Sequence, residues 1–300
     1  MKLFHYTAAF GLCISMFACN NPQPKNTNAV NDDKAITTNV ASNNVRIDYT
    51  DTGTGDTTLL FVHGWCINKT YWEKQVAYFG KRYRVVTIDL PGFGKSGKNR
   101  KDWSTAAYGQ DIKNVVAQLK LKNVILVGHS MAGDIILQGA VDAPENVLAL
   151  VGVDNFKSVG IASKDSVKDK KEYDEAIGAM KKNFKAVAFD WFNKQLFYKT
   201  TPKSIRDRIL NDVAHADSTI AIAALAWDSN FSESNELLKL KKKLYLINSD
   251  YVPNDTAGLV KKRIPYKLFI VHDTGHFPMI EKPEDFNRQL DNVIADIKRQ

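Results

Sequence analysis

The chain has 300 residues, of which 44% are hydrophobic, and its formal net charge at pH 7 is +8. A chain of this length and composition can bury a large core, and one α/β domain of this size is ordinary. Lysines gather in short runs such as 168–171 and 239–243, and no basic stripe is interleaved with aromatic residues. We interpret the charge as solvated helix surface, which leaves attraction to an anionic surface open but predicts no nucleic-acid partner.

Residues 1–19 are typical of an export signal. Lys2 precedes a mostly apolar stretch, 3–18, that is too short to span a membrane comfortably. Met16-Phe17-Ala18-Cys19 is similar to a bacterial lipoprotein cleavage box, although leucine is more usual at the position of Met16. The sequence therefore predicts an exported protein of the bacterial cell envelope, facing the periplasm or the surface and anchored through lipid on Cys19. Ordinary cleavage near Ala18, giving a soluble secreted protein, is the alternative.

Residues 20–43 are rich in Asn, Thr, Pro and Asp and contain few apolar residues, so they are predicted to form a flexible tether. The folded domain is predicted to span 44–300 and to begin with an edge strand at 45–49. Cys66 is the only cysteine of that domain, so no internal disulfide is expected. We interpret Cys66 as a packing residue rather than as a second nucleophile.

Short apolar runs then alternate with amphipathic segments along the chain. This alternation predicts a parallel sheet that is covered by helices on both faces. The predicted strands are 59–62, 84–88, 124–127, 147–153, 243–247 and 267–271, and the predicted helices are 106–119, 130–141 and 283–298.

The stretch from 155 to 242 carries no strand signal. Helical periodicity dominates it, for instance at 173–184 and 218–226, and aromatic residues cluster at 189–192 and 197–198. The sequence therefore predicts a helical insertion after the strand at 147–153, at about 157–235. Most of its aromatic residues are expected to pack in a core, because large apolar side chains are usually buried.

The most informative motif is the apolar strand that runs into Gly128-His129-Ser130-Met131-Ala132. A Gly-x-Ser-x-small sequence between a strand and a helix places the serine on a sharp turn, where its hydroxyl is exposed to a site. The last small residue is usually glycine and is Ala132 here. Ser130 is therefore the predicted nucleophile.

Three further motifs occur in a characteristic order. They are His63-Gly64-Trp65 after the first apolar strand, the glycine-rich 89–97, and 273–277 after the last strand. Together with the serine motif they resemble the α/β-hydrolase superfamily over about 44–300. The resemblance implies a mostly parallel sheet flanked by helices, with a helical cap inserted after the sixth strand above the serine. It also implies the chain order serine, acid, histidine.

His276 is the best candidate for the base among six histidines. It follows a strand and Gly275, which permits a sharp loop, and the resemblance supports it. The acid is expected at the carboxyl end of a strand. The resemblance favours Asp250, while Asp154 at the end of the sixth strand and Asp255 remain alternatives.

The resemblance also implies an oxyanion hole made by the backbone N–H groups of Trp65 and Met131. Segment 89–97 lacks the Gly-Lys-Ser/Thr helix start of a phosphate-binding loop and is interpreted as a turn after the fourth strand. No cluster of His, Cys or carboxylate residues has metal-site spacing. No metal and no cofactor are therefore expected.

These features predict a serine hydrolase that cleaves a carboxylic ester of a small to medium substrate through an acyl-enzyme. A serine nucleophile argues against the epoxide hydrolases and haloalkane dehalogenases of the superfamily, which use aspartate there. A lactonase, a carbon–carbon bond hydrolase, an aminopeptidase and a cofactor-free haloperoxidase remain alternatives. A ligand sensor with slow turnover is an alternative from a different functional class.

Overall fold

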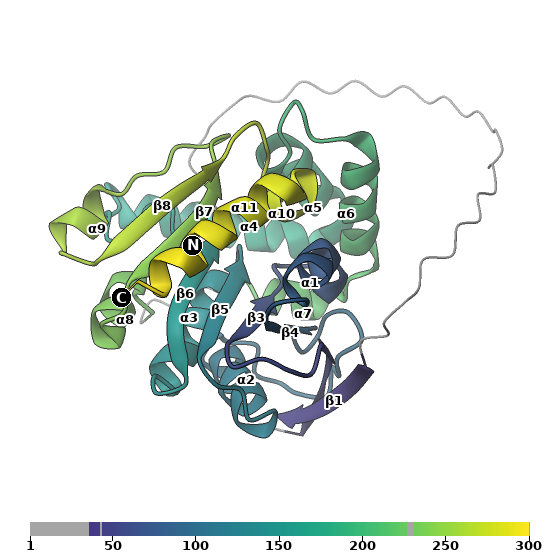
Figure 1. Cartoon of the computed structure of the whole chain (residues 1–300). Helices are drawn as coiled ribbons and strands as arrows, with labels where there is room; N and C mark the ends of the chain where they lie inside the picture. The colour runs from purple at the N-terminus through teal and green to yellow at the C-terminus, as the bar shows by residue number, and fades with distance from the viewer. Residues whose placement is uncertain (1–35, 43, 227–230, 300) are drawn as a thin grey trace.

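The computed structural model describes residues 36–42, 44–226 and 231–299 (Figure 1). The predicted signal, Cys19 and the first part of the predicted tether lie outside these residues. In the part of the chain that is described, no helix is both long enough and apolar enough to cross a membrane.

The centre of the molecule is an eight-stranded sheet with the order β1-β2-β4-β3-β5-β6-β7-β8. β1 and β2 are antiparallel to their neighbours, and the remaining strands pair in parallel. The strands are β1 (Ile36–Ser42), β2 (Val45–Asp51), β3 (Thr58–Val62), β4 (Arg84–Ile88), β5 (Val124–His129), β6 (Val147–Val153), β7 (Leu244–Ser249) and β8 (Tyr266–Val271).

The inner strands explain the parallel arrangement. Every residue of β3, β5 and β7 is buried, so these strands need cover on both faces of the sheet. The crossover helices between parallel strands supply that cover. The predicted α/β fold with a mostly parallel sheet is therefore confirmed.

One boundary was predicted wrongly. Ile36–Ser42 was expected to belong to the flexible tether, and 45–49 was expected to be the edge strand. Instead β1 pairs with the whole of β2 and forms the edge itself. Ser42 is buried and donates from Oγ to Asp111 at 2.6 Å. Polar local composition hid this strand, because its stability comes from pairing and from that buried contact.

Helices lie on both faces of the sheet (Figure 1). One face carries α1 (Glu73–Phe79) and α11 (Pro283–Ile297). The other carries α2 (Thr105–Gln118), α3 (Ala132–Asp142) and α8 (Glu233–Leu240), with α3 packed between its two neighbours. Three shorter elements, η1 (Lys69–Trp72), α9 (Ala257–Lys261) and α10 (Pro278–Glu281), lie in the connecting segments.

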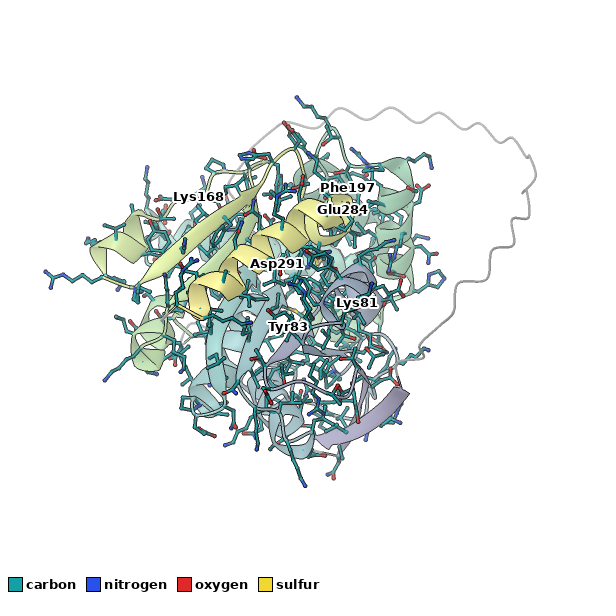
Figure 2. The ribbon with its side chains drawn as sticks, in the orientation of Figure 1. Lys81, Tyr83, Lys168, Phe197, Glu284 and Asp291 are labelled. Carbon is teal, nitrogen blue, oxygen red and sulfur yellow. The ribbon has the colours of Figure 1, made fainter. Side chains whose placement is uncertain are left out.

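α11 is held against α1 by polar contacts at their exposed side. Asp291 of α11, labelled in Figure 2, accepts a hydrogen bond from Tyr78 Oη at 2.6 Å and pairs with Arg82 at 2.9 Å. α11 begins on Pro283, as the sequence predicts, because proline at the first helical turn loses no hydrogen bond. The last helix thereby fixes the end of the chain next to β7 and β8.

Between β6 and β7 the described residues form only helices and loops, which agrees with the predicted insertion. α4, α5, α6 and α7 contact one another and make the cap, whereas α8 packs on α3 and belongs to the sheet's own helical layer. The cap elements are α4 (Ser166–Lys182), α5 (Phe184–Trp191), η2 (Phe192–Leu196), α6 (Lys203–His215) and α7 (Ser218–Ala223).

Candidate active site

Ser130 lies on the sharp turn between β5 and α3. Its backbone φ is +54°, in the left-handed region that non-glycine residues rarely adopt. The Ser130 N–H donates to Val153 O at 3.0 Å, which ties the turn to β6. A Cβ on Gly128 would lie 2.5 Å from the carbonyl oxygen of Ala132, so only glycine fits there. Strand and helix therefore crowd the turn and hold the serine in a strained backbone.

The Asn155 side chain also holds this turn, through two hydrogen bonds. Its Nδ2 donates to the carbonyl oxygens of Gly128 at 3.2 Å and Ser130 at 3.1 Å. The backbone carbonyl oxygen of Asn155 accepts from Asn248 Nδ2 at 3.0 Å, which links this residue to β7. The sequence gives no local signal for this role, because the contacts join three different strands.

His276 meets Ser130 as the sequence predicts. Its Nε2 lies 2.7 Å from Ser130 Oγ, and its Nδ1 lies 2.6 Å from Asp154 Oδ2. With a proton on Nδ1, the imidazole donates to the carboxylate and accepts from the serine hydroxyl. This is the arrangement in which a histidine removes a proton from a serine.

The carboxylate that contacts His276 belongs to Asp154, so the geometry corrects the expectation of Asp250. Asp250 is exposed, and its carboxylate faces the surface residue His272, with Oδ2 2.7 Å from Nδ1. Asp250 also accepts from the Asp273 N–H at 3.2 Å. Its contacts are thus with the loop that follows β8 rather than with His276.

The sheet explains this choice. β5 pairs with β6 so that His129 lies opposite Val153, and the next residues, Ser130 and Asp154, leave the sheet side by side. β7 is one strand farther from the serine, and Asp250 follows the last residue of that strand. Asp255, the third candidate, is exposed and accepts from the Ala257 N–H at 3.0 Å in a local turn.

Asp154 is buried and strongly stabilised as a carboxylate. Its Oδ1 accepts from the backbone N–H of Ser249 at 2.9 Å, from Ser249 Oγ and from Lys157 Nζ at 2.8 Å. Burial opposes its ionisation, but the Lys157 cation and the hydrogen bond from His276 outweigh burial and hold the pKa of this carboxyl well below its usual range. Asp154 is therefore held as a carboxylate anion beside His276.

His129 contacts the loop 272–277, which carries His276 and which we call the histidine loop. Burial lowers the pKa of His129 to about 3, so its ring is neutral. Its Nε2 donates to the carbonyl oxygen of His276 at 2.7 Å, and the two rings lie 4.8 Å apart between centroids. The sequence shows His129 inside the serine motif but not this contact.

Glu281 holds the same loop from the other side. Its carboxylate accepts from the backbone N–H groups of Gly275 at 3.0 Å and Phe277 at 3.1 Å, which flank His276. It also accepts from Thr201 Oγ1, in the cap, at 2.7 Å. One carboxylate thus ties the histidine loop to the cap, and no motif in the sequence predicts that role.

Trp65 and Met131 are the residues whose backbone N–H groups the sequence predicts as oxyanion donors. Within the described residues, neither backbone N–H has a hydrogen-bond acceptor. His63 Nδ1 donates to Gly64 O at 2.7 Å, while its Nε2 accepts from Leu90 N–H at 2.9 Å. Because a planar trans peptide holds its C=O and N–H in opposite directions, this bond turns the Trp65 N–H away from His63 and leaves it available.

The Trp65 indole joins the core to the cap. Its Nε1 donates to Ala221 O at 2.7 Å, and its side chain is buried. The rings of Phe184, Trp191 and Phe192 lie with centroids 5.6, 5.5 and 5.9 Å from it. We call these four aromatic residues the Trp65 cluster. The cap therefore packs against the buried Trp65 through aromatic contacts.

Two features near the site have structural roles. Cys66 is buried, and burial raises the pKa of its thiol, which agrees with a packing residue. In segment 89–97 the Asp89 carboxylate accepts from the backbone N–H groups of Lys69 at 2.7 Å and Lys95 at 2.8 Å. An internal carboxylate occupies this turn, so it does not present its N–H groups to a phosphate.

Among the described residues, no group of three or more His, Cys, Asp or Glu side chains is placed to hold a metal ion.

Comparison with known proteins agrees with the geometry. The sequence profile of a family described as the alpha/beta hydrolase fold matches residues 57–283. An uncharacterized protein of Mycobacterium bovis is 36% identical over 107 residues, which cover 36% of this chain and only 30% of that protein.

Two similar solved structures are a bromoperoxidase from Bacillus anthracis and an esterase from Exiguobacterium antarcticum. The bromoperoxidase is 22% identical with a TM-score of 0.75, and the match covers 87% of this chain and 100% of that one. The esterase is 23% identical with a TM-score of 0.75, over 88% and 100% of the two chains. At these identities the structures show a shared fold, and the profile match covers most of the chain. The chain belongs to the α/β hydrolase fold family.

Proposed function

We propose that this protein is a serine hydrolase that cleaves a carboxylic ester through an acyl-enzyme, with Ser130 as nucleophile, His276 as base and Asp154 as acid. The observation that carries the proposal is the continuous chain of hydrogen bonds, 2.7 Å from Ser130 Oγ to His276 Nε2 and 2.6 Å from His276 Nδ1 to Asp154 Oδ2. The same fold in an esterase is consistent with it.

The reaction follows from these positions. Ser130 Oγ attacks the ester carbonyl while His276 Nε2 takes its proton, and Asp154 stabilises the imidazolium that forms. The backbone N–H groups of Trp65 and Met131 donate to the oxyanion, and each such donor is typically worth about 3 kcal/mol of transition-state stabilisation. His276 then passes the proton to the leaving alcohol. A water molecule, activated by His276, attacks the acyl-enzyme and releases the acid.

The Trp65 cluster is our reason to expect a substrate with a short acyl group. The oxyanion donor Trp65 carries a buried indole whose position is set by the hydrogen bond to Ala221 O. Phe184 of this cluster also lines a hollow of about 470 Å³ between the end of α4 and α7. Phe184 thus both contacts the Trp65 ring and lines the hollow. We propose that it limits the length of the acyl chain.

Turnover of p-nitrophenyl esters from acetyl to octanoyl tests both proposals. We expect multiple turnovers on the short esters and none in Ser130→Ala, whose unfolding midpoint should stay close to that of the wild type. Lactones belong in the same panel. Turnover of lactones without turnover of linear esters would replace the esterase proposal by a lactonase, and a single turnover without recycling would favour a sensor.

Phe184→Ala should raise kcat/KM on octanoyl relative to acetyl esters by about tenfold, because it removes a ring that contacts Trp65 and lines the hollow. Phe189→Ala is the matched control, since this aromatic residue of the same helix is outside the Trp65 cluster. An unchanged chain-length preference in Phe184→Ala would show that the acyl chain lies elsewhere.

We also propose that the protein is exported and anchored through lipid on Cys19. The sequence alone supports this, through 1–19. Several acyl chains of a lipoprotein hold a membrane firmly, whereas one chain binds only marginally. Cys19→Ser should therefore move the protein from the membrane fraction to the soluble fraction or block its processing. A correctly cleaved Cys19→Ser protein that resists salt washing from membranes would contradict the lipid anchor.

A further inference from the structure

Asp154 has a partner that a Ser-His-Asp arrangement does not require. Lys157 lies in the loop that follows β6, and its Nζ is 2.8 Å from Asp154 Oδ1. The same Nζ is 3.3 Å from Ser249 Oγ and 4.5 Å from the centroid of the Tyr251 ring. The Lys157 side chain is only 16% exposed. This ammonium is thus held in a largely desolvated position by three separate contacts.

Lys157 and His276 contact different oxygens of the Asp154 carboxylate. His276 Nδ1 contacts Oδ2, while Lys157 contacts Oδ1. A carboxylate without a cation raises the proton affinity of a neighbouring imidazole, because the pair of opposite charges is stabilised. A cation on the other oxygen offsets this effect through the same carboxylate. The Asp154–Lys157 pair next to His276 therefore carries little net charge.

The other titratable groups around this pair do not supply the same compensation. Tyr251 Oη lies 3.4 Å from His276 Nδ1, and burial, followed by the charge of Asp154, raises the pKa of this phenol well above its usual range, so it stays neutral. His129 is neutral because burial lowers its pKa to about 3. Glu281 is an anion, held by backbone N–H groups of the histidine loop. Among the described groups facing the pair, Lys157 is thus the cation.

We propose that Lys157 is a positioning residue that sets the pH range of the reaction by partly neutralising Asp154, the carboxylate that contacts His276. The inference rests on the proposed Ser130–His276–Asp154 function and adds a fourth member to it. Lys157 acts through Asp154 and touches no reacting atom.

The rate at which a fluorophosphonate labels Ser130, measured from pH 4.5 to 9, tests this proposal without a known substrate. In Lys157→Met the acid limb of the profile should move up by about one pH unit, the size expected when a neighbouring charge is removed. At a pH below both midpoints the labelling rate should fall about tenfold, and on the plateau it should stay within about threefold. Lys157→Arg keeps the cation and should keep the wild-type midpoint.

Lys203→Met is the matched control, since it removes a lysine from an exposed pair with Asp207 at 2.6 Å, far from the triad in the sequence. Its profile should match the wild type. A purely structural Lys157 would instead lower the labelling rate of Lys157→Met by the same factor at every pH. That result, or an unshifted acid limb, would overturn the inference.

Lys157→Gln provides a second neutral variant, and thermal unfolding shows whether each variant is folded. If both neutral variants fail to fold, Lys157 is a structural residue and the inference is wrong. A wild-type protein that is not labelled, or labelling that survives Ser130→Ala, would overturn the proposed function itself. Labelling confined to Ser130 with no shift in Lys157→Met would overturn only the role of Lys157.

Discussion

The ends of β6 and β7 offer two similar aspartates in two different environments. Asp154 leaves β6 buried, with a left-handed backbone (φ +49°), and its carboxylate contacts His276, Ser249 and Lys157. Asp250 leaves β7 exposed, and its carboxylate contacts His272. Both follow apolar strands in a parallel sheet. The difference shows that the local pattern of strand then acid is not enough to identify the acid. The position of each strand in the sheet, and its register against its neighbour, decide which aspartate reaches His276.

Asp154→Asn is the most direct test of the difference between the two aspartates. An asparagine keeps the size of the side chain but no longer stabilises an imidazolium, and it favours the wrong tautomer of His276. We expect ester turnover to fall on the order of 10³–10⁴-fold with an unchanged fold. Kinetics on p-nitrophenyl acetate and a circular dichroism spectrum measure the two effects. A loss below tenfold would remove Asp154 from the proposed triad.

Glu281→Ala tests what holds His276 over the end of β6. The change leaves the backbone N–H groups of Gly275 and Phe277 without their acceptor and frees the loop from Thr201. Because small displacements of a catalytic group are costly, kcat should fall by about 10- to 100-fold with little change in KM. Glu284→Ala, on the exposed first turn of α11, is the control. Equal kcat values in the two variants would show that the loop is held by other contacts.

The two aspartates should also differ in acid stability. The pKa of Asp154 is depressed in the folded state, so its ionisation stabilises the fold above the unfolded-state pKa near 4, and this contribution is lost as pH falls below that value. Urea unfolding of wild type and Asp154→Asn between pH 3 and 7 isolates the contribution. We expect the wild type to lose about 1 kcal/mol more than Asp154→Asn over this range, because only the last pH unit lies below the unfolded-state pKa. Parallel curves would show that Asp154 is not preferentially ionised in the folded state.

Asp250→Asn should have the smallest effect. The residue is exposed and contacts a surface histidine, so ester turnover should stay within about twofold of the wild type and stability should change by less than about 0.5 kcal/mol. The measurement uses the same esters and the same urea series as for Asp154→Asn. A large loss of turnover would mean that the loop after β8 rearranges in solution to bring Asp250 to His276.

Much of the fold was accessible from the sequence. The apolar runs at β3, β5 and β7 are so continuous that only buried strands accommodate them, and the intervening amphipathic segments require helices on both faces. Ser130 and His276 were also accessible, because each lies in a short motif whose glycine and strand context are local. The structure brings these two side chains within 2.7 Å of each other.

Only the tertiary structure decided which carboxylate reaches His276. The pairing of His129 with Val153 places Asp154 next to Ser130, and strand order is a property of the sheet rather than of either strand. The polar segment Ile36–Ser42 became an edge strand for a similar reason, since β2 and Asp111 supply its stability. Lys157 likewise acquires its role from folding. A charge gains strength when burial removes water from it, and no residue pattern states which charges will be buried together.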